Sequence, residues 1–261
     1  MKRYFNLIRK SIQIQLEYRM SFFISILSMG LYYIVQFSIV GFTVMKFHDL
    51  NGWKIEEIAF LYSFVLVAQG INTMIFGPLV RFDEVIRKGE WDYLLTRPMK
   101  PLVTLLCMQF DPSAVVHFFL GIGFFFYAAS QMGLELDFWK MLIVLQVWVG
   151  GAMVMASIRI IIASVAFYAV SIESLVHFFV YSSKEFILYP INIYKNPIPF
   201  VLTFIFPIAF INYYPSHIFL HKENLFFDGL RYFSFPVGLV LFVISLYLFR
   251  LGGRSYHSTG T

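Results

Sequence analysis

The stretch RFDEVIRKGEWDYLLTRPMKP, residues 81–101, is a polar island in an otherwise apolar chain. It holds five of the 20 Lys and Arg residues and four of the 15 carboxylates, and the apolar run on either side is long enough to cross a bilayer. Charges at this density cannot lie in lipid. The pattern predicts a short amphipathic helix over 81–88, broken by Gly89, resumed from Glu90 and stopped by Pro98. An ordinary charged loop that sets the orientation of the chain would show the same features.

Composition places the rest of the chain in the membrane class. Of its 261 residues 59% are hydrophobic and 13% are charged, whereas a soluble domain is usually about 25% charged. Six spans of roughly 20 residues each would occupy about half of the chain. We therefore expect one transmembrane domain over residues 1–261, with no room for a soluble catalytic domain.

Apolar stretches recur seven times along the chain. They cover residues 22–45, 58–80, 113–130, 138–166, 174–189, 198–214 and 232–249. Seven spans would place the two termini on opposite sides of the membrane, although both termini are basic. One stretch should therefore not span.

The stretch at 198–215 is the best candidate for a segment that does not span. It is short, and five prolines frame or interrupt it, at positions 190, 197, 199, 207 and 215. Non-helical backbone at membrane depth is tolerated only where protein or a water-filled cavity satisfies its polar groups. We predict six transmembrane helices, with a pair of re-entrant or interfacial helices between spans 5 and 6. We also predict an N-terminal interfacial helix over residues 1–20, because its apolar and basic residues would occupy different faces of a helix.

The basic residues also predict the orientation. With six spans, twelve Lys and Arg residues fall on the side of the termini and of residues 81–101, and six on the other side. The excess marks the cytoplasmic side, so both termini and Gly89 are expected inside, and Gly52 and Lys222 outside. The net charge of +5 is explained by these membrane borders, which favours the lipid bilayer rather than nucleic acid as a partner.

The chain shows no pattern typical of an enzyme. It lacks the glycine-rich phosphate loop, the His-Glu-x-x-His zinc pattern and the Gly-x-Ser-x-Gly nucleophile turn. The single Cys107 excludes an internal disulfide and a cysteine metal cluster. We expect neither catalytic nor metal-binding residues, and no cofactor bound by this chain.

Three charged residues lie inside predicted spans, where charge is costly and usually functional. Arg159 lies near the inner end of the fourth span, so its side chain either reaches the interface or faces the bundle. Lys184 and Glu185 are adjacent, hence about 100° apart on a helix, and cannot both face lipid. These three residues are candidates for a translocation path or a helix interface.

Small residues in the spans predict close helix contacts. They are Gly121, Gly123, Gly150, Gly151 and Ala163. Contacts of this kind concern packing and give no information about a substrate.

The polar island resembles the cytoplasmic loop of ABC-2 superfamily permeases, the membrane subunits of bacterial ABC exporters. The likeness is carried by Arg87, Gly89, Asp92, Leu94, Leu95, Arg97 and Pro98. It implies a coupling helix at 81–96, between spans 2 and 3, that docks on a separate ATPase subunit. The residues expected to couple to that ATPase are Arg81, Arg87, Lys88, Gly89, Glu90, Trp91, Asp92, Tyr93, Leu94 and Arg97. Among them, Trp91, Tyr93 and Leu94 are the expected anchors.

The resemblance also implies the partners and the location. A second permease copy or a paralogue would complete the path, ATP and Mg²⁺ would bind the ATPase subunit, and the location would be the cell inner membrane. Two other functions stay open. A polytopic enzyme acting on lipids could use Asp83, Glu84, Glu90 and Asp92 as metal-binding carboxylates, although basic residues are interleaved with them. A channel or secondary transporter is less favoured, because ionisable residues do not cluster at mid-membrane.

Overall fold

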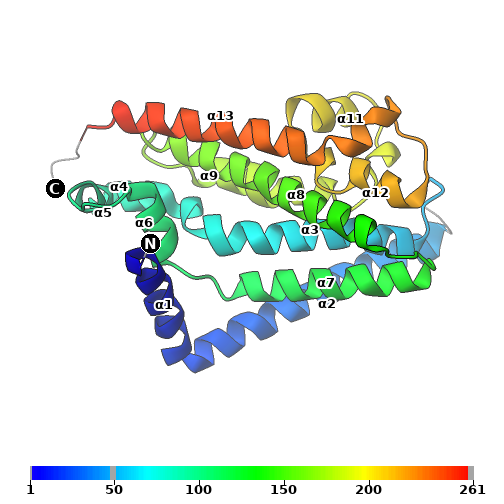
Figure 1. Cartoon of the computed structure of the whole chain (residues 1–261), viewed down its shortest axis with the longest axis horizontal. Coiled ribbons are helices and arrows are strands. Elements are labelled where there is room, and N and C mark those ends of the chain that lie inside the picture. Colours follow the sequence, from blue (N-terminus) through cyan, green and yellow to red (C-terminus); the bar gives the residue numbers. More distant parts are fainter. Residues whose placement is uncertain (1, 48–50, 258–261) are drawn as a thin grey trace.

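The computed structural model describes residues 2–47 and 51–257, which form helices and connections without a strand. Five helices lie roughly lengthwise in the molecule (Figure 1) and are long and apolar enough to cross a membrane. They are α2 (Arg19–Phe47), α3 (Ile55–Phe76), α7 (Ser113–Gln131), α8 (Phe138–Val165) and α13 (Ser234–Arg254). The prediction of an all-α polytopic membrane protein is confirmed.

The segment predicted as the fifth span is helical but short. It consists of α9 (Glu173–Val176), the π-helical turn η2 (His177–Ser182) and α10 (Ser183–Phe186). A turn then leads to Pro190, which has no N–H with which to continue a helix. The helical run is shorter than the roughly 20 residues of a perpendicular crossing, so it is not one of the five long helices.

The proline-rich segment that follows is bent, as its sequence predicts. It contains α11 (Ile198–Phe200), η4 (Val201–Ile205), η5 (Ile208–Phe210) and α12 (Tyr213–Leu220). Its two halves meet at 78°, at a point where Pro207 interrupts the backbone hydrogen bonds. Two buried hydroxyl groups near the bend are partners of each other, since Thr203 Oγ1 lies 2.8 Å from Tyr214 Oη. The break is confirmed, and the re-entrant path stays a prediction.

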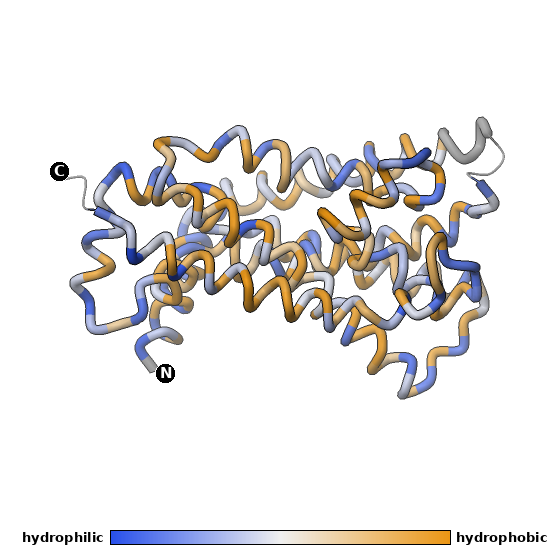
Figure 2. Tube along the Cα trace, turned by 90° about the horizontal axis from the view of Figure 1, so that it is seen from above, coloured by the Kyte–Doolittle hydropathy of each residue, from blue (hydrophilic) through white to orange (hydrophobic). Residues whose placement is uncertain are grey.

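The two ends of the molecule carry different elements. Figure 1 shows α1 (Lys2–Glu17) lying across the long axis, at the same end as α4 (Phe82–Arg87), α5 (Glu90–Leu95), α6 (Pro101–Met108) and the last turns of α13. α11 and α12 lie at the opposite end. In Figure 2, hydrophilic positions gather mainly towards the two ends, with apolar stretches between them. The described chain therefore crosses the length of the molecule an even number of times.

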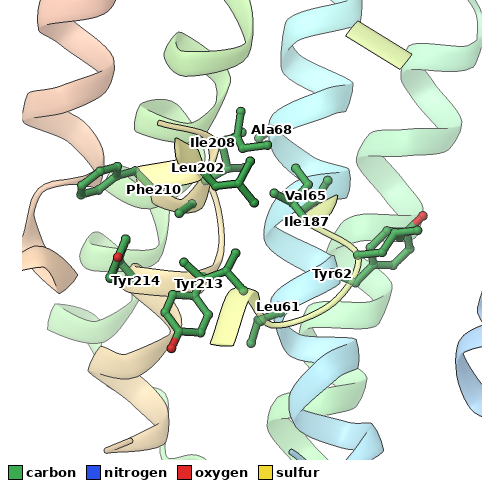
Figure 3. Close-up of a cluster of buried hydrophobic side chains, with 14 of the residues drawn as sticks. Leu61, Tyr62, Val65, Ala68, Ile187, Leu202, Ile208, Phe210, Tyr213 and Tyr214 are labelled. Carbon is green, nitrogen blue, oxygen red and sulfur yellow. The ribbon is translucent and has the colours of Figure 1, made fainter. Parts of the chain in front are cut away.

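α3 is the central helix of the bundle. In its most apolar stretch 83% of the residues are buried, against 11% in α2. Figure 3 shows Leu61, Val65 and Ala68 of α3 facing Ile208 and Tyr213 of the bent segment. A helix that is apolar on every side is a buried helix, so α3 supports the helices around it.

Glycines allow α8 and α13 to touch along their backbones. A Cβ added at Gly238 would lie 2.5 Å from the carbonyl oxygen of Gly150, and one added at Gly150 would lie 2.8 Å from the Phe235 backbone. α3 and α7 meet in the same way, because a Cβ at Gly121 would lie 2.7 Å from Val67. The expectation for Gly123 is wrong: nothing lies within 4 Å of a Cβ there, because Gly123 is on another face of α7.

The glycine contacts give a stability prediction. Gly238→Val would place a side chain against the backbone of Gly150, and overpacking of this kind typically costs about 1–3 kcal/mol. Gly123→Val is the matched control, because it makes the same helix-interior change where space is open. We expect the thermal midpoint of Gly238→Val in detergent to be lower by at least about 2 °C than that of the control. Equal midpoints would show that α8 and α13 do not pack through these glycines.

Candidate functional site

The predicted coupling segment forms two short helices joined at a left-handed glycine. After the 3₁₀ turn η1 (Gly77–Arg81), α4 ends at Arg87 and α5 begins at Glu90. Gly89 between them has φ 67°, a conformation that glycine adopts without steric cost. The predicted break at Gly89 is therefore confirmed.

One face of this segment is buried against the ends of the long helices. Phe82 and Trp91 are 0% and 4% exposed, and their ring centroids are 5.0 Å apart. The Trp91 ring lies 5.8 Å from the ring of Phe167 and 5.9 Å from that of Phe249 in α13. The segment is thus packed onto the bundle by an aromatic cluster, defined here as Phe82, Trp91, Phe167 and Phe249.

Trp91 and Leu94, two of the three expected anchors, face the bundle rather than solvent. Leu94 is 3% exposed and joins the same core as Trp91. An aromatic residue in a charged loop was expected to face a partner, but a segment that must stay attached to the bundle buries its largest side chains there. Tyr93 points the other way and is 56% exposed.

The outer face of the segment is charged. Its exposed side chains are those of Arg81, Arg87, Lys88, Glu90, Tyr93, Leu95 and Thr96. Arg81, at the start of the segment, also lines the larger of the cavities described below. Asp92 and Arg97 are half-buried, and the Arg97 guanidinium carbon lies 4.3 Å from the centre of the Tyr93 ring. This face offers basic groups and one aromatic ring to a partner.

Carboxylates of the segment are engaged with neighbouring groups rather than gathered around one point. Glu84 Oε2 lies 3.1 Å from Lys88 Nζ, and Asp83 Oδ2 lies 3.6 Å from Arg87 Nη2. Asp83 Oδ2 also accepts a hydrogen bond of 3.3 Å from the backbone N–H of Ile172, just before α9. Among the described residues, no three His, Cys, Asp or Glu side chains are placed to hold a metal ion.

A second polar region lies inside the bundle. Two adjoining cavities of about 850 and 610 Å³ share several lining residues, among them Gln69 of α3 and Lys184 of α10. Residues from α1, α2, α7 and α8 complete the walls. Cavities of this size are typical of small-molecule sites.

Arg159 and Lys184 meet at the wall of these cavities. Arg159 is 4% exposed, and its Nη2 donates a 3.2 Å hydrogen bond to Thr73 Oγ1. The Gln69 side-chain oxygen, in the amide orientation that faces donors, accepts hydrogen bonds of 3.1 Å from both Lys184 Nζ and Arg159 Nη2. Gln69 therefore joins two positive side chains from different helices.

The sequence left the direction of Arg159 open, and the structure decides it. Arg159 does not reach for the membrane interface, because its side chain is enclosed by α3, α8 and α10. Glu185, the third charged candidate, is exposed and lines neither cavity. Arg159 and Lys184 are thus brought together, and Glu185 is not.

Sequence reasoning missed the polar residues that surround Arg159 and Lys184. They are Gln69, Thr73, Asp111, Ser113 and His117. The spacing of Gln69 and Thr73, four residues apart in an apolar helix, places them on one face and could have indicated the site. Asp111 could not be assigned, because it lies in a connection whose path is set by tertiary packing.

Comparison with known proteins decides the family. Residues 31–260 match the family described as ABC-2 family transporter protein. The chain belongs to the ABC-2 transporter family. No curated protein and no solved structure was found to match it. Membership makes this ABC-2 protein a multi-pass membrane permease component of an ABC transporter, and membrane subunits of this family generally pair with an ATPase subunit.

The two faces of the segment should respond differently to truncation. Trp91→Ala removes a buried aromatic side chain, a change that typically costs about 3–5 kcal/mol, so the thermal midpoint of the ABC-2 protein should fall. Tyr93→Ala alters an exposed ring and should leave the midpoint nearly unchanged. Thermal unfolding of both variants in the same detergent checks this. A larger loss for Tyr93→Ala would reverse the assignment of the faces.

Proposed function

We propose that this ABC-2 protein is the permease subunit of an ATP-driven exporter, and that a separate ATPase subunit docks on the outer face of α4 and α5. The observation that carries the proposal is the division of this segment into a buried aromatic face and an exposed basic face. Exposed ion pairs contribute little to stability, so the exposed groups can contact a partner without loss of the fold. ATP and Mg²⁺ would bind the ATPase subunit.

The buried face supplies a route for coupling. The aromatic cluster joins α4 and α5 to α13, and Phe167 lies just after α8. The Asp83 carboxylate is hydrogen-bonded to the start of α9. A displacement of the outer face by nucleotide-driven closure of the ATPases would therefore move the helices that carry Arg159 and Lys184. Transport would follow from rocking of these helices against a second permease copy or paralogue.

Docking can be tested by site-specific crosslinking. A photoreactive side chain is placed at position 88, 93 or 94 of the full chain, which is co-expressed with an ATP-binding-cassette subunit. Positions 88 and 93 are exposed and should crosslink to the ATPase, whereas position 94 is buried and should not.

Charge reversal at the same face provides a second readout. Arg87→Glu combined with Lys88→Glu should reduce co-purification of the ATPase, and Lys140→Glu, at the start of α8, is the control. The proposed docking face is wrong, and the segment is a spacer, if two results are found together. The ATPase would co-purify equally with the unmodified chain, the double variant and Lys140→Glu, and it would crosslink equally from positions 88, 93 and 94.

The orientation of the ABC-2 protein in the inner membrane is also a proposal. Both termini and the segment with α4 and α5 are assigned to the cytoplasm. The excess of Lys and Arg on that side supports this, and so does the position of α1, α4, α5 and the end of α13 at one end of the molecule (Figure 1).

Cysteine labelling tests the orientation. In a Cys107→Ser background, an impermeant thiol reagent added to intact cells should modify Gly52→Cys and Glu135→Cys, which lie in connections at the other end of the long helices. It should spare Lys88→Cys until the membrane is permeabilised. Modification of position 88 in intact cells would overturn the assignment.

A further inference from the structure

Among the described residues, Arg159 and Lys184 bring two basic side chains together without a carboxylate at ion-pairing distance. Gln69 and Thr73, their hydrogen-bond partners, are both neutral. Among the described residues, no carboxylate lies within 4.0 Å of either basic group. Two nitrogens of Arg159, Nε and Nη1, are buried and have no hydrogen-bond partner in the described part of the chain.

Such an arrangement is unfavourable when nothing else binds. Removing a charge from water is expensive unless it is paired and hydrogen-bonded, and two like charges near each other add repulsion. Structural burial of charge normally uses an acidic partner. The absence of one among the described residues therefore indicates that the negative charge comes from outside the chain.

The surrounding charges favour an anion. Arg81 lines the larger cavity at the coupling-segment end and adds a third basic group. Asp111 is the carboxylate that lines both cavities, and its Oδ1 accepts a 2.9 Å hydrogen bond from the Ser113 backbone N–H at the start of α7. His117 Nδ1 donates to the carbonyl oxygen of Ser113 at 2.5 Å. Three basic side chains thus line the larger cavity together with one carboxylate, which is already hydrogen-bonded.

The walls of the smaller cavity favour a ligand with an apolar part. Met29, Tyr32, Leu66 and Leu188 line it, beside Lys184. One wall is formed by α2, the long helix with the least burial in the molecule. A ligand with a charged group at Lys184 and a hydrocarbon chain along α2 would match both the charge and the apolar surface.

We propose that these adjoining cavities bind the acidic headgroup of an amphiphile, a phosphate or carboxylate carried on one or more hydrocarbon chains. The anionic group lies against Lys184, with Arg159 behind it held by Thr73 and Gln69. The hydrocarbon lies along the α2 wall. The proposal deepens the proposed function, since it names the class of cargo that a permease with this cavity would accept.

Binding to the isolated full chain tests the proposal without an ATPase. Native mass spectrometry of the detergent-solubilised protein gives binding isotherms for short-chain phosphatidylglycerol, for phosphatidylcholine of the same chain length, and for glycerol phosphate, which lacks acyl chains. We expect phosphatidylglycerol to bind about tenfold or more tightly than phosphatidylcholine, as for one charge-assisted contact. Glycerol phosphate should bind far more weakly than phosphatidylglycerol.

Variants at position 184 assign that preference to the cavity. Lys184→Met keeps the length of the side chain and removes the charge, so the preference for phosphatidylglycerol should be lost. Lys184→Arg keeps the charge and should keep the preference. Lys140→Met is the matched control, because Lys140 lies outside the cavities and its Nζ donates to the Glu135 carbonyl oxygen.

A folding control accompanies these measurements. Because Lys184→Met removes an uncompensated charge, its thermal midpoint without lipid should equal or exceed that of the unmodified chain. Phosphatidylglycerol should then stabilise the unmodified chain and Lys184→Arg, and not Lys184→Met.

Three results would overturn the proposal. Equal affinity for the two lipids would show that the headgroup charge is not recognised, and a preference that survives in Lys184→Met would place the site elsewhere. Binding of glycerol phosphate as tight as that of phosphatidylglycerol would show that the ligand is a soluble anion. Failure of ATPase docking leaves all of these measurements unaffected, so the two proposals can fail separately.

Discussion

Between apolar helices in lipid there is no hydrophobic driving force, and close packing has to supply the association. The structure meets this constraint at α3, which is enclosed by α7, α8 and the bent segment and is apolar on every side. Glycines on α7 and α8 bring the neighbouring backbones near enough to interdigitate with it. The last turns of this helix carry Gln69 and Thr73, and its end continues into the coupling segment.

The same helix links the two candidate regions. From Thr73, which holds Arg159, the chain runs through η1 into α4, whose inner face packs on the aromatic cluster. The polar site in the last turns of α3 and the partner-binding face of α4 and α5 are thus close in the chain. Movement of one can be transmitted to the other, because packed interiors shift as units rather than deform continuously. α2 is the opposite case, because it has the least buried apolar stretch among the long helices of the described chain, and it forms one wall of the cavities.

The charged residues of the coupling segment and those inside the bundle differ in their surroundings. On the segment the exposed Arg87 pairs with the buried Asp83, and Lys88 pairs with Glu84 at the surface, where solvent screens the charges and the pair contributes little to stability. Arg159 and Lys184 are held by neutral groups inside the bundle, where the same charge is costly. Ion pairs at the surface therefore shape a contact face, whereas unpaired cations inside the bundle indicate an external anion.

The sequence by itself determined the helical membrane class, the break at Gly89, the interruption of the proline-rich segment and the family motif. These features depend on local properties: apolar length, a left-handed backbone position and the missing N–H of proline. Only the tertiary structure decided that Trp91 and Leu94 face inward, that Gly121 rather than Gly123 contacts α3, and that Arg159 meets Lys184 and not a carboxylate. The helices are apolar around their whole circumference, so periodicity could not indicate which face meets a neighbour. That choice was made by the packing of elements far apart in the chain.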